Sequence, residues 1–261
     1  MKNIVSIMLT SSLVLGGAGS VFATEETSGP DGDSTIDMNV EITLEQQEDE
    51  LLNEANTEEE IVLVEERFEE HAALVKAAEA TSMENNKIST LAANTASGSL
   101  SVPYYKQEKS YWCGPATTKQ TIQLIKGSSS SQTSIASAIG TTSAGSVLSS
   151  MVKYVNANQS KHKYLVINSP SESLIQSIAE YGVRNKAPAM GRLKIAKGGN
   201  WTYNSAGHYM NMSGYRNYGK EIRVTDPYIG WVNASSGGSY YVTSKEFHTA
   251  TKNHFANQIS Y

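Results

Sequence analysis

The sequence predicts an α+β fold for residues 99–261, with helices first along the chain and an antiparallel sheet after them. Apolar residues recur at helical spacing as far as residue 181, and strand patterns with Gly- and Asn-rich turns replace them from residue 187 onward. All fourteen Tyr and all three Trp lie after residue 100. The large side chains that can build a core therefore belong to this half of the chain.

The first helix of this predicted domain begins at Cys113. Pro115 stands near the first helical position, where the missing N–H of proline costs nothing. The apolar pattern continues through Ile122 and Ile125, and Gly127 ends it. Further helices are expected at residues 133–138, 143–156 and 171–181.

Four strands are expected next, at residues 187–194, 208–215, 221–226 and 238–243. A hairpin between the second and third of these strands would bring Asp226, at the end of one, beside His208, at the start of the other. Several aromatic residues of this region can line a cleft or, alternatively, belong to the core as cross-strand pairs; they are Trp201, Tyr203, Trp231, Tyr240 and Tyr241.

The N-terminus has the pattern of a secretory signal peptide, residues 1–23. Lys2 supplies the positive charge, residues 4–15 the apolar stretch, and Val21-Phe22-Ala23 the small-residue cleavage site. An anchored transmembrane helix is the alternative, but the stretch is short and polar residues interrupt it. No second apolar run of membrane-spanning length follows. We therefore expect a secreted protein, extracellular or associated with the cell wall.

Residues 24–98 form an acidic segment with helical character. Residues 24–100 hold 20 acidic and 3 basic residues, whereas residues 101–261 hold 6 acidic and 17 basic residues. Two helices are expected, at 41–55 and 57–85, the second with a capping box at Thr57–Glu60. One apolar stripe on it consists of Ile61, Val64, Phe68, Ala72 and Val75.

The opposite charges, −17 and +11, predict that this segment associates with the following domain through the linker at residues 89–98. The hypothesis is an inhibitory or chaperoning pro-region of a zymogen. The alternative is a solvated acidic helix without a target.

Cys113 is the single cysteine, which excludes a disulfide framework and a Cys-rich zinc site. Its position at a helix N-terminus favours the reactive thiolate. His208 is the best placed base, because His71 and His162 are expected at the surface and His248 and His254 in solvated or structural roles. Asp226 can then fix the imidazole tautomer.

Two segments, VPYYKQ at 102–107 and YWCGPA at 111–116, resemble the nucleophile segment of the C39-like peptidases, a branch of the papain-like cysteine proteases. Gly207-His208-Tyr209 and Asp226-Pro227 resemble the later motifs of that family. The resemblance implies a papain-like fold. It also implies Cys113 as nucleophile, His208 as base and acid, Asp226 as the residue that orients the imidazole, and Gln107 as a donor to the oxyanion.

The resemblance implies a peptide or protein substrate and no cofactor or metal. The sequence has neither a transmembrane segment pattern nor a P-loop motif, so we expect a stand-alone secreted peptidase. Its basic domain favours anionic surroundings such as cell-wall polymers, and no nucleic-acid partner is expected. Two alternatives stay open: a cell-wall amide hydrolase or acyl-transferring enzyme with the same residues, and an inert basic wall-binding module.

Overall fold

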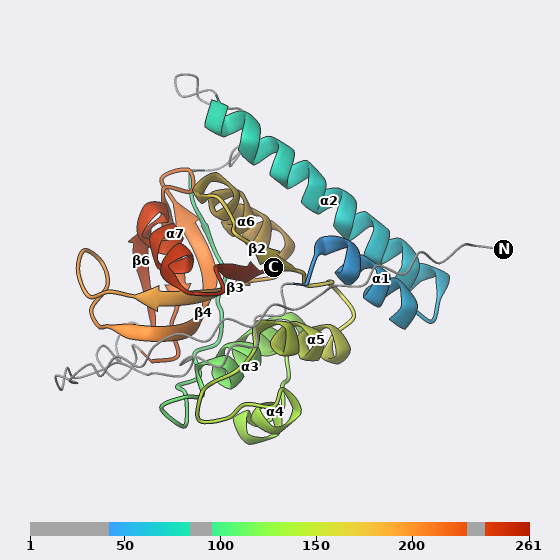
Figure 1. The fold of residues 1–261 in the computed structure, drawn as a ribbon, viewed down its shortest axis with the longest axis horizontal. Coiled ribbons are helices and arrows are strands. Elements are labelled where there is room, and N and C mark those ends of the chain that lie inside the picture. The colour runs from blue at the N-terminus through green and yellow to red at the C-terminus, as the bar shows by residue number, and fades with distance from the viewer. Residues whose placement is uncertain (1–41, 84–95, 229–237) are drawn as a thin grey trace, which may run out of the picture.

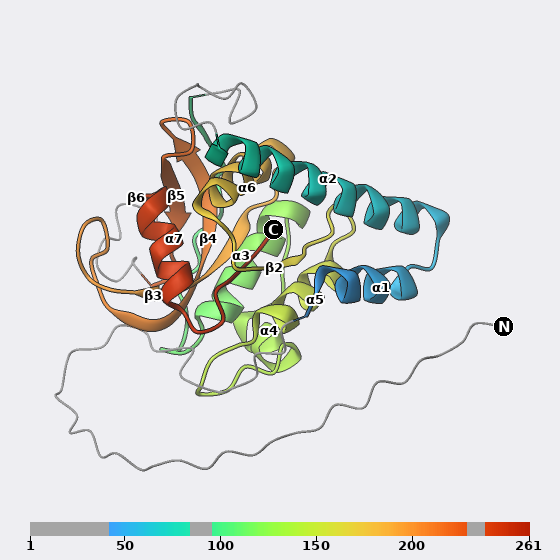
Figure 2. The same cartoon turned by 45° about the horizontal axis from the view of Figure 1, so that its top comes forward.

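The computed structural model describes residues 42–83, 96–228 and 238–261. Helices cover both faces of an antiparallel sheet, and two N-terminal helices lie along one side of the domain (Figures 1 and 2). The predicted α+β class is confirmed. The predicted signal peptide, most of the predicted linker, and Trp231 lie outside the described residues. No helix in the described ranges is long and apolar enough to cross a bilayer.

The two helices predicted in the acidic segment are present as α1 (Leu44–Glu54) and α2 (Glu58–Met83). Thr43 and Gln46 form a capping box at the start of α1. At the start of α2 the Thr57 hydroxyl accepts from the Glu60 N–H, as predicted, but the Glu60 carboxylate accepts from the N–H of Asn56, one residue further back. Both helix starts are thus stabilised by side chains that replace missing backbone acceptors.

Three helices follow on one face of the sheet: α3 (Cys113–Lys126), α4 (Gln132–Ala138) and α5 (Leu148–Asn158). As predicted, Pro115 lies in the first turn of α3 and Gly127 closes the helix, with a φ of 82° that favours glycine. The packed residues between these helices and the sheet include Ile122, Ile135 and Met151, each almost fully buried.

The sheet has the strand order β2-β7-β3-β4-β5-β6, with β1 paired to β4, and every described pairing is antiparallel. Its long central strands are β3 (Ala189–Ile195) and β4 (Ser205–Arg216). The others are β1 (Gly98–Ser99), β2 (Val166–Asn168), β5 (Glu221–Thr225), β6 (Ser239–Thr243) and β7 (Gln258–Ser260). The four predicted strands correspond to β3, β4, β5 and β6.

The other face of the sheet packs against α6 (Glu172–Asn185) and α7 (Ser244–Asn253), and α2 packs on α6. The core on this side includes Ile175, Ile178 and Phe247, each fully buried. A Cβ atom at Gly191 of β3 would lie 2.5 Å from the Phe247 ring, so only glycine fits at this position. Helix α7 and the short strands β1, β2 and β7 were not predicted.

The buried side of α2 differs from the predicted apolar stripe. Val64 is fully buried, but Ile61 is 37% exposed and Ala72 is exposed, while the polar Arg67 and His71 are 4% and 5% exposed. The expectation that His71 lies at the surface is therefore wrong. Burial and the nearby Arg67 charge lower the pKa of His71 to about 4, so this ring is neutral at physiological pH.

Hydrogen bonds attach α1 and α2 to the β2–β7 side of the domain. Gln47 accepts from the Val166 N–H at 2.7 Å and donates to the Val166 carbonyl at 2.9 Å. Arg67 donates to the carbonyls of Lys163 and Tyr261, both at 3.0 Å, and its guanidinium lies 4.1 Å from the Tyr261 ring centroid. The acidic segment thus packs on the domain, contrary to the alternative of a helix without a target.

Candidate active site

Cys113 is the first residue of α3, and its side chain is fully buried. The N-cap residue is Trp112, whose side chain makes no capping hydrogen bond, so it does not occupy the positive end of the helix dipole. Gly114 permits close packing here, because a Cβ atom at this position would lie 2.7 Å from the Cβ of Ser146. The thiol is therefore held at a helix N-terminus by tight packing.

His208 and Asp226 form a buried hydrogen-bonded pair. His208 lies near the start of β4, opposite Leu193 of β3, and Asp226 directly follows β5. The imidazole Nε2 lies 2.8 Å from Asp226 Oδ1, and both side chains are fully buried. Since Nε2 is used by the carboxylate, Nδ1 is the nitrogen left to face the Cys113 thiol, which interacts with this ring.

The charge state of this pair follows from its surroundings. Burial alone lowers the pKa of His208, but the Asp226 charge, the hydrogen bond between them and the Cys113 side chain raise it to about 10. Burial raises the pKa of Asp226, yet the His208 charge and several hydrogen bonds bring it below its ordinary value. The pair is therefore an imidazolium–carboxylate ion pair at neutral pH.

The polypeptide segment that carries Gln107 is bound to the end of β5. The Gln107 N–H donates to the carbonyl of Pro227 at 3.1 Å, and Asp226 N–H donates to Gly238 at 2.8 Å. These bonds explain why residues 107 and 226, far apart in sequence, belong to one site.

The Gln107 side chain is 1% exposed, and its Nε2 donates to the carbonyls of Lys109 (3.0 Å) and Ser110 (2.7 Å). Both amide hydrogens are thus directed to the turn before Cys113. To donate to an oxyanion, as the sequence predicts, Gln107 must release one of these bonds.

Two further residues bind Asp226 that the sequence did not assign to the site. The hydroxyls of Tyr203 and Tyr240 donate to Asp226 Oδ2 at 2.5 and 3.0 Å. From the sequence, these aromatic residues could line a cleft or belong to the core. In the structure their hydroxyls bind Asp226. No sequence motif predicts this contact, because Tyr203 and Tyr240 are far apart in the chain and a long-range hydroxyl donor has no local pattern.

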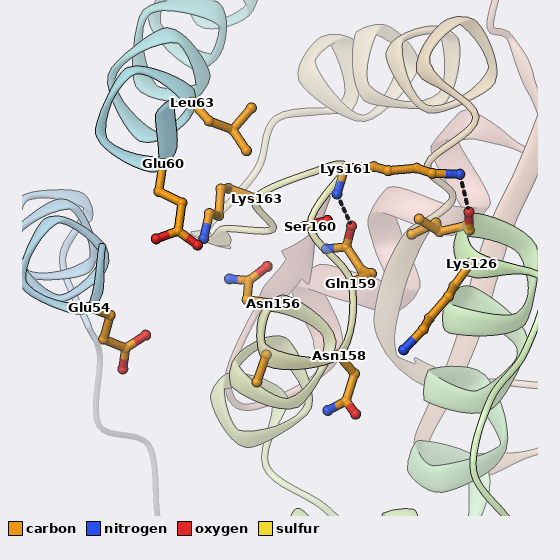
Figure 3. Close-up of a pocket in the computed structure, with 12 residues that line it drawn as sticks. Glu54, Glu60, Leu63, Lys126, Asn156, Asn158, Gln159, Ser160, Lys161 and Lys163 are labelled. Carbon is orange, nitrogen blue, oxygen red and sulfur yellow. Dashed lines mark hydrogen bonds between the residues drawn. The ribbon is translucent and has the colours of Figure 1, made fainter. Parts of the chain in front are cut away.

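Figure 3 shows a cavity of about 510 Å³ at the opposite end of α3 from Cys113. Glu54 and Glu60 of the α1–α2 corner line one side, with Lys163 beside Glu60, and Lys126, the last residue of α3, lines the other side. A helix of 14 residues is about 20 Å long. The α1–α2 corner therefore approaches the domain about 20 Å from the thiol.

An α+β fold in which a domain helix begins at a buried cysteine, with a His–carboxylate pair supplied by the sheet, defines the class of papain-like cysteine peptidases. Within that class the chain belongs to the Peptidase C39-like family, whose model matches residues 99–258. The family expected from the sequence is confirmed. No curated protein matches the chain.

Among solved structures, the chain is similar to the crystal structure of the peptidase domain of Streptococcus ComA, a bi-functional ABC transporter involved in a quorum sensing pathway. The sequences are 15% identical, the TM-score is 0.42, and the match covers 61% of this chain and 96% of that chain.

Proposed function

We propose that this protein is a secreted cysteine peptidase that hydrolyses peptide bonds with Cys113, His208 and Asp226 and is made as a zymogen. The observation that carries the proposal is the buried His208–Asp226 ion pair, whose imidazole interacts with Cys113, the first residue of α3. Such a pair supplies both the base and the acid that acyl transfer from an amide needs. Secretion rests on the signal-peptide pattern of residues 1–23.

The chemistry proceeds in two halves. The Cys113 thiolate attacks the carbonyl carbon of the scissile amide, forming a C–S bond, and negative charge collects on the carbonyl oxygen. The His208 imidazolium gives its Nδ1 proton to the amide nitrogen as the C–N bond breaks, and the amine leaves. A water molecule then gives a proton to the neutral His208 imidazole and attacks the thioester; the C–S bond breaks, which releases the acid and restores the Cys113 thiolate and the His208 imidazolium.

The site is closed in this structure, because the side chains of Cys113, His208 and Asp226 have no exposed surface. Substrate reaches the sulfur only after the residues above it move. This closure supports the proposed latency of the chain. In our proposal the closed site keeps the chain latent, and α1 and α2, which line a cavity at the far end of α3, do not plug it.

Changing Gln107 to alanine should lower kcat/KM by roughly 10²–10³, the usual cost of losing one oxyanion donor. Steady-state hydrolysis of a fluorogenic peptide measures it. Because Gln107 also supports the turn before Cys113, the matched control is Gln132→Ala. Gln132 bonds the backbone on both sides of residue 107, donating to Lys106 O at 2.7 Å and accepting from Glu108 N at 3.1 Å. If kcat/KM fell equally in both variants, Gln107 would only support the turn and would not donate to the oxyanion.

The role proposed for residues 24–98 is that of a pro-region that stabilises the domain. Gln47 supplies both hydrogen bonds that a neighbouring strand would give to Val166 of β2. On the same side of the sheet, Arg67 donates a hydrogen bond to the carbonyl of Tyr261, the residue that follows β7. A sheet edge covered in this way cannot pair with another chain during folding. The acidic segment thus acts as an intramolecular chaperone in our proposal.

Changing Arg67 to alanine should lower the free energy of unfolding by about 3 kcal/mol, because two hydrogen bonds from a buried charged donor are lost. For a chain of this size that corresponds to about 6–12 °C in Tm. Lys76→Ala removes the same charge from an exposed position of α2 and should leave Tm within about 1 °C. Differential scanning calorimetry of the full chain compares them, and equal Tm values for both variants would refute the stabilising role.

The experiment that tests the proposed function follows mass over time for the purified chain from residue 24, alone and with a general peptide mixture, under mild reductant. We expect cleaved peptides, and alkylation of Cys113 by iodoacetamide at neutral pH once the site has opened. Isolated cell walls are incubated in parallel. Release of wall fragments without peptide cleavage would favour a cell-wall amide hydrolase, and a trimmed domain that neither cuts nor reacts would favour the inert wall-binding module.

A further inference from the structure

Asp226 is bound by more donors than an imidazole alone requires. Oδ1 accepts from the Tyr228 N–H at 2.8 Å in addition to its bond with His208, and Oδ2 accepts from the two tyrosine hydroxyls of Tyr203 and Tyr240. All four contacts come from different parts of the chain. A fully buried carboxylate is costly to ionise unless its oxygens are hydrogen-bonded, and here both oxygens have two donors.

Tyr203 also contacts the other member of the pair. Its ring meets the His208 ring edge to face, with centroids 5.8 Å apart and planes at 90°, and it packs on Tyr228 at 4.9 Å. Tyr203 is 8% exposed, and it precedes β4, the strand that carries His208. Tyr240 lies on β6, which pairs with β5 at Val224, just before Asp226. The two hydroxyls therefore approach Oδ2 from opposite sides of β5, one from the segment before β4 and the other from β6.

We propose that Tyr203 and Tyr240 are positioning residues, whose hydroxyls hold the Asp226 carboxylate ionised and fixed with Oδ1 on the imidazole of His208. The inference rests on the function proposed above. The two tyrosines do not touch the reacting atoms, and they act through Asp226.

Among the described residues, the titratable groups that bond to the Asp226 carboxylate through their side chains are His208 on β4, Tyr203 before that strand and Tyr240 on β6. The ring of Tyr228 packs on Tyr203 and His208, and Cys113 of α3 interacts with the imidazole. Burial and the Asp226 charge place the pKa of both tyrosines well above the ordinary value, so both remain neutral donors. Removing a hydroxyl takes a donor from the ionised carboxylate and moves the pKa of Asp226 upward.

The test uses Tyr203→Phe, Tyr240→Phe and their combination in the full chain, with kcat measured after the wild type and the variants have become active under mild reductant. Each single change should lower kcat about 10-fold and the pair about 100-fold, with KM unchanged, because the imidazole is held less firmly in the transition state while substrate contacts remain. Tyr241→Phe is the matched control. It removes a hydroxyl from the next residue of the same strand, whose ring stacks on Arg216, 4.0 Å away.

A second readout does not depend on activity. The folded-state pKa of Asp226 is depressed, so its ionisation stabilises the fold above the unfolded pKa near 3.8, and this stability is lost as the pH falls. The stability deficit of Tyr203→Phe or Tyr240→Phe should therefore be full at pH 7 and shrink as the pH falls through the raised pKa of the variant. Urea unfolding at several pH values measures it, and Tyr241→Phe should show no such trend.

The outcomes separate the two proposals. A pH-independent deficit together with unchanged kcat in both Phe variants would overturn the positioning role. A pH-dependent deficit in a protein that never cleaves peptides would support the tyrosine pair while the proposed function fails. If Tyr203→Phe does not fold, Tyr240→Phe carries the test, because its hydroxyl bonds the same oxygen and its ring is only half-buried.

Discussion

Changing Cys113 to alanine is expected to abolish peptide hydrolysis, with a loss in kcat on the order of 10⁶, since removal of a nucleophile leaves only binding and oxyanion stabilisation. The fold should survive. Alanine is the best helix former, and Cys113 occupies the first position of α3, where it adds only one buried sulfur to the core. The measurement is release of fluorescent peptide by wild type and variant at equal concentration, with near-UV circular dichroism to verify the fold.

Cys113→Ser serves as the control for shape. Serine keeps the size of the side chain, but its hydroxyl is not ionised by an imidazole in the same way as a thiol, so we expect loss of most activity there too. Cleavage that persists undiminished in the alanine variant would mean that another group, or another protein in the preparation, is the nucleophile. The proposed function would then be withdrawn.

The fold was predictable where local signals coincide with tertiary structure. Gly127 ends α3, Pro115 lies in its first turn, and the alternation of residues 221–226 corresponds to β5. Strands β2 and β7 have three residues each, too few to show a period. Helix α7 did have a signal, since Thr243 and Glu246 form a capping box at its start.

Polar residues caused the largest error. The predicted stripe of α2 assumed that apolar residues face the domain, but Arg67 and His71 lie on that face. Arg67 is buried because carbonyls of Lys163 and Tyr261 accept its hydrogen bonds, and His71 Nδ1 lies 2.6 Å from the Tyr261 hydroxyl. Partners about 100 and 190 residues away decide that burial, and periodicity within one helix contains no information about them.

The site shows the same division. Cys113 and His208 could be chosen from the sequence because a helix start and a strand start are local features. The hydrogen bonds of the Gln107 amide and those of the two tyrosine hydroxyls to Asp226 depend on how loops and strands meet, so no sequence pattern indicates them. Candidates for the reacting groups were thus easier to choose from the sequence than the groups that hold them in place.

Changing Asp226 to alanine should lower kcat on the order of 10⁴, the loss typical for the acid of such a triad. His208 then has no acceptor for its Nε2 proton and is free to adopt the wrong tautomer or rotate away from Cys113. Steady-state kinetics on the same peptide as above measures the loss. A decrease of less than 10-fold would show that Asp226 does not orient the imidazole.

Asp226→Asn separates orientation from charge. The Tyr228 N–H can only donate, so the amide oxygen should take the Oδ1 position beside His208, while the new NH₂ meets Tyr203 and Tyr240, whose hydroxyl oxygens can accept. Orientation is kept and the negative charge is lost. We therefore expect a loss of only about 10²-fold at pH 7, far less than in the alanine variant.

The pH profile of the asparagine variant tests this reasoning. In the wild type the carboxylate raises the pKa of His208 to about 10, so the imidazolium persists until the pH rises toward that value. Without the charge, burial still lowers the pKa of His208 and the Cys113 side chain is left to raise it, so the pKa falls below the wild-type value. The alkaline limb of kcat/KM should move to lower pH accordingly.

The wild type also gains stability from the His208 charge; this stability is present below pH 6.5 and is lost as the pH rises toward 10. It should be absent from the asparagine variant. An unchanged alkaline limb would show that Asp226 does not set the charge of His208.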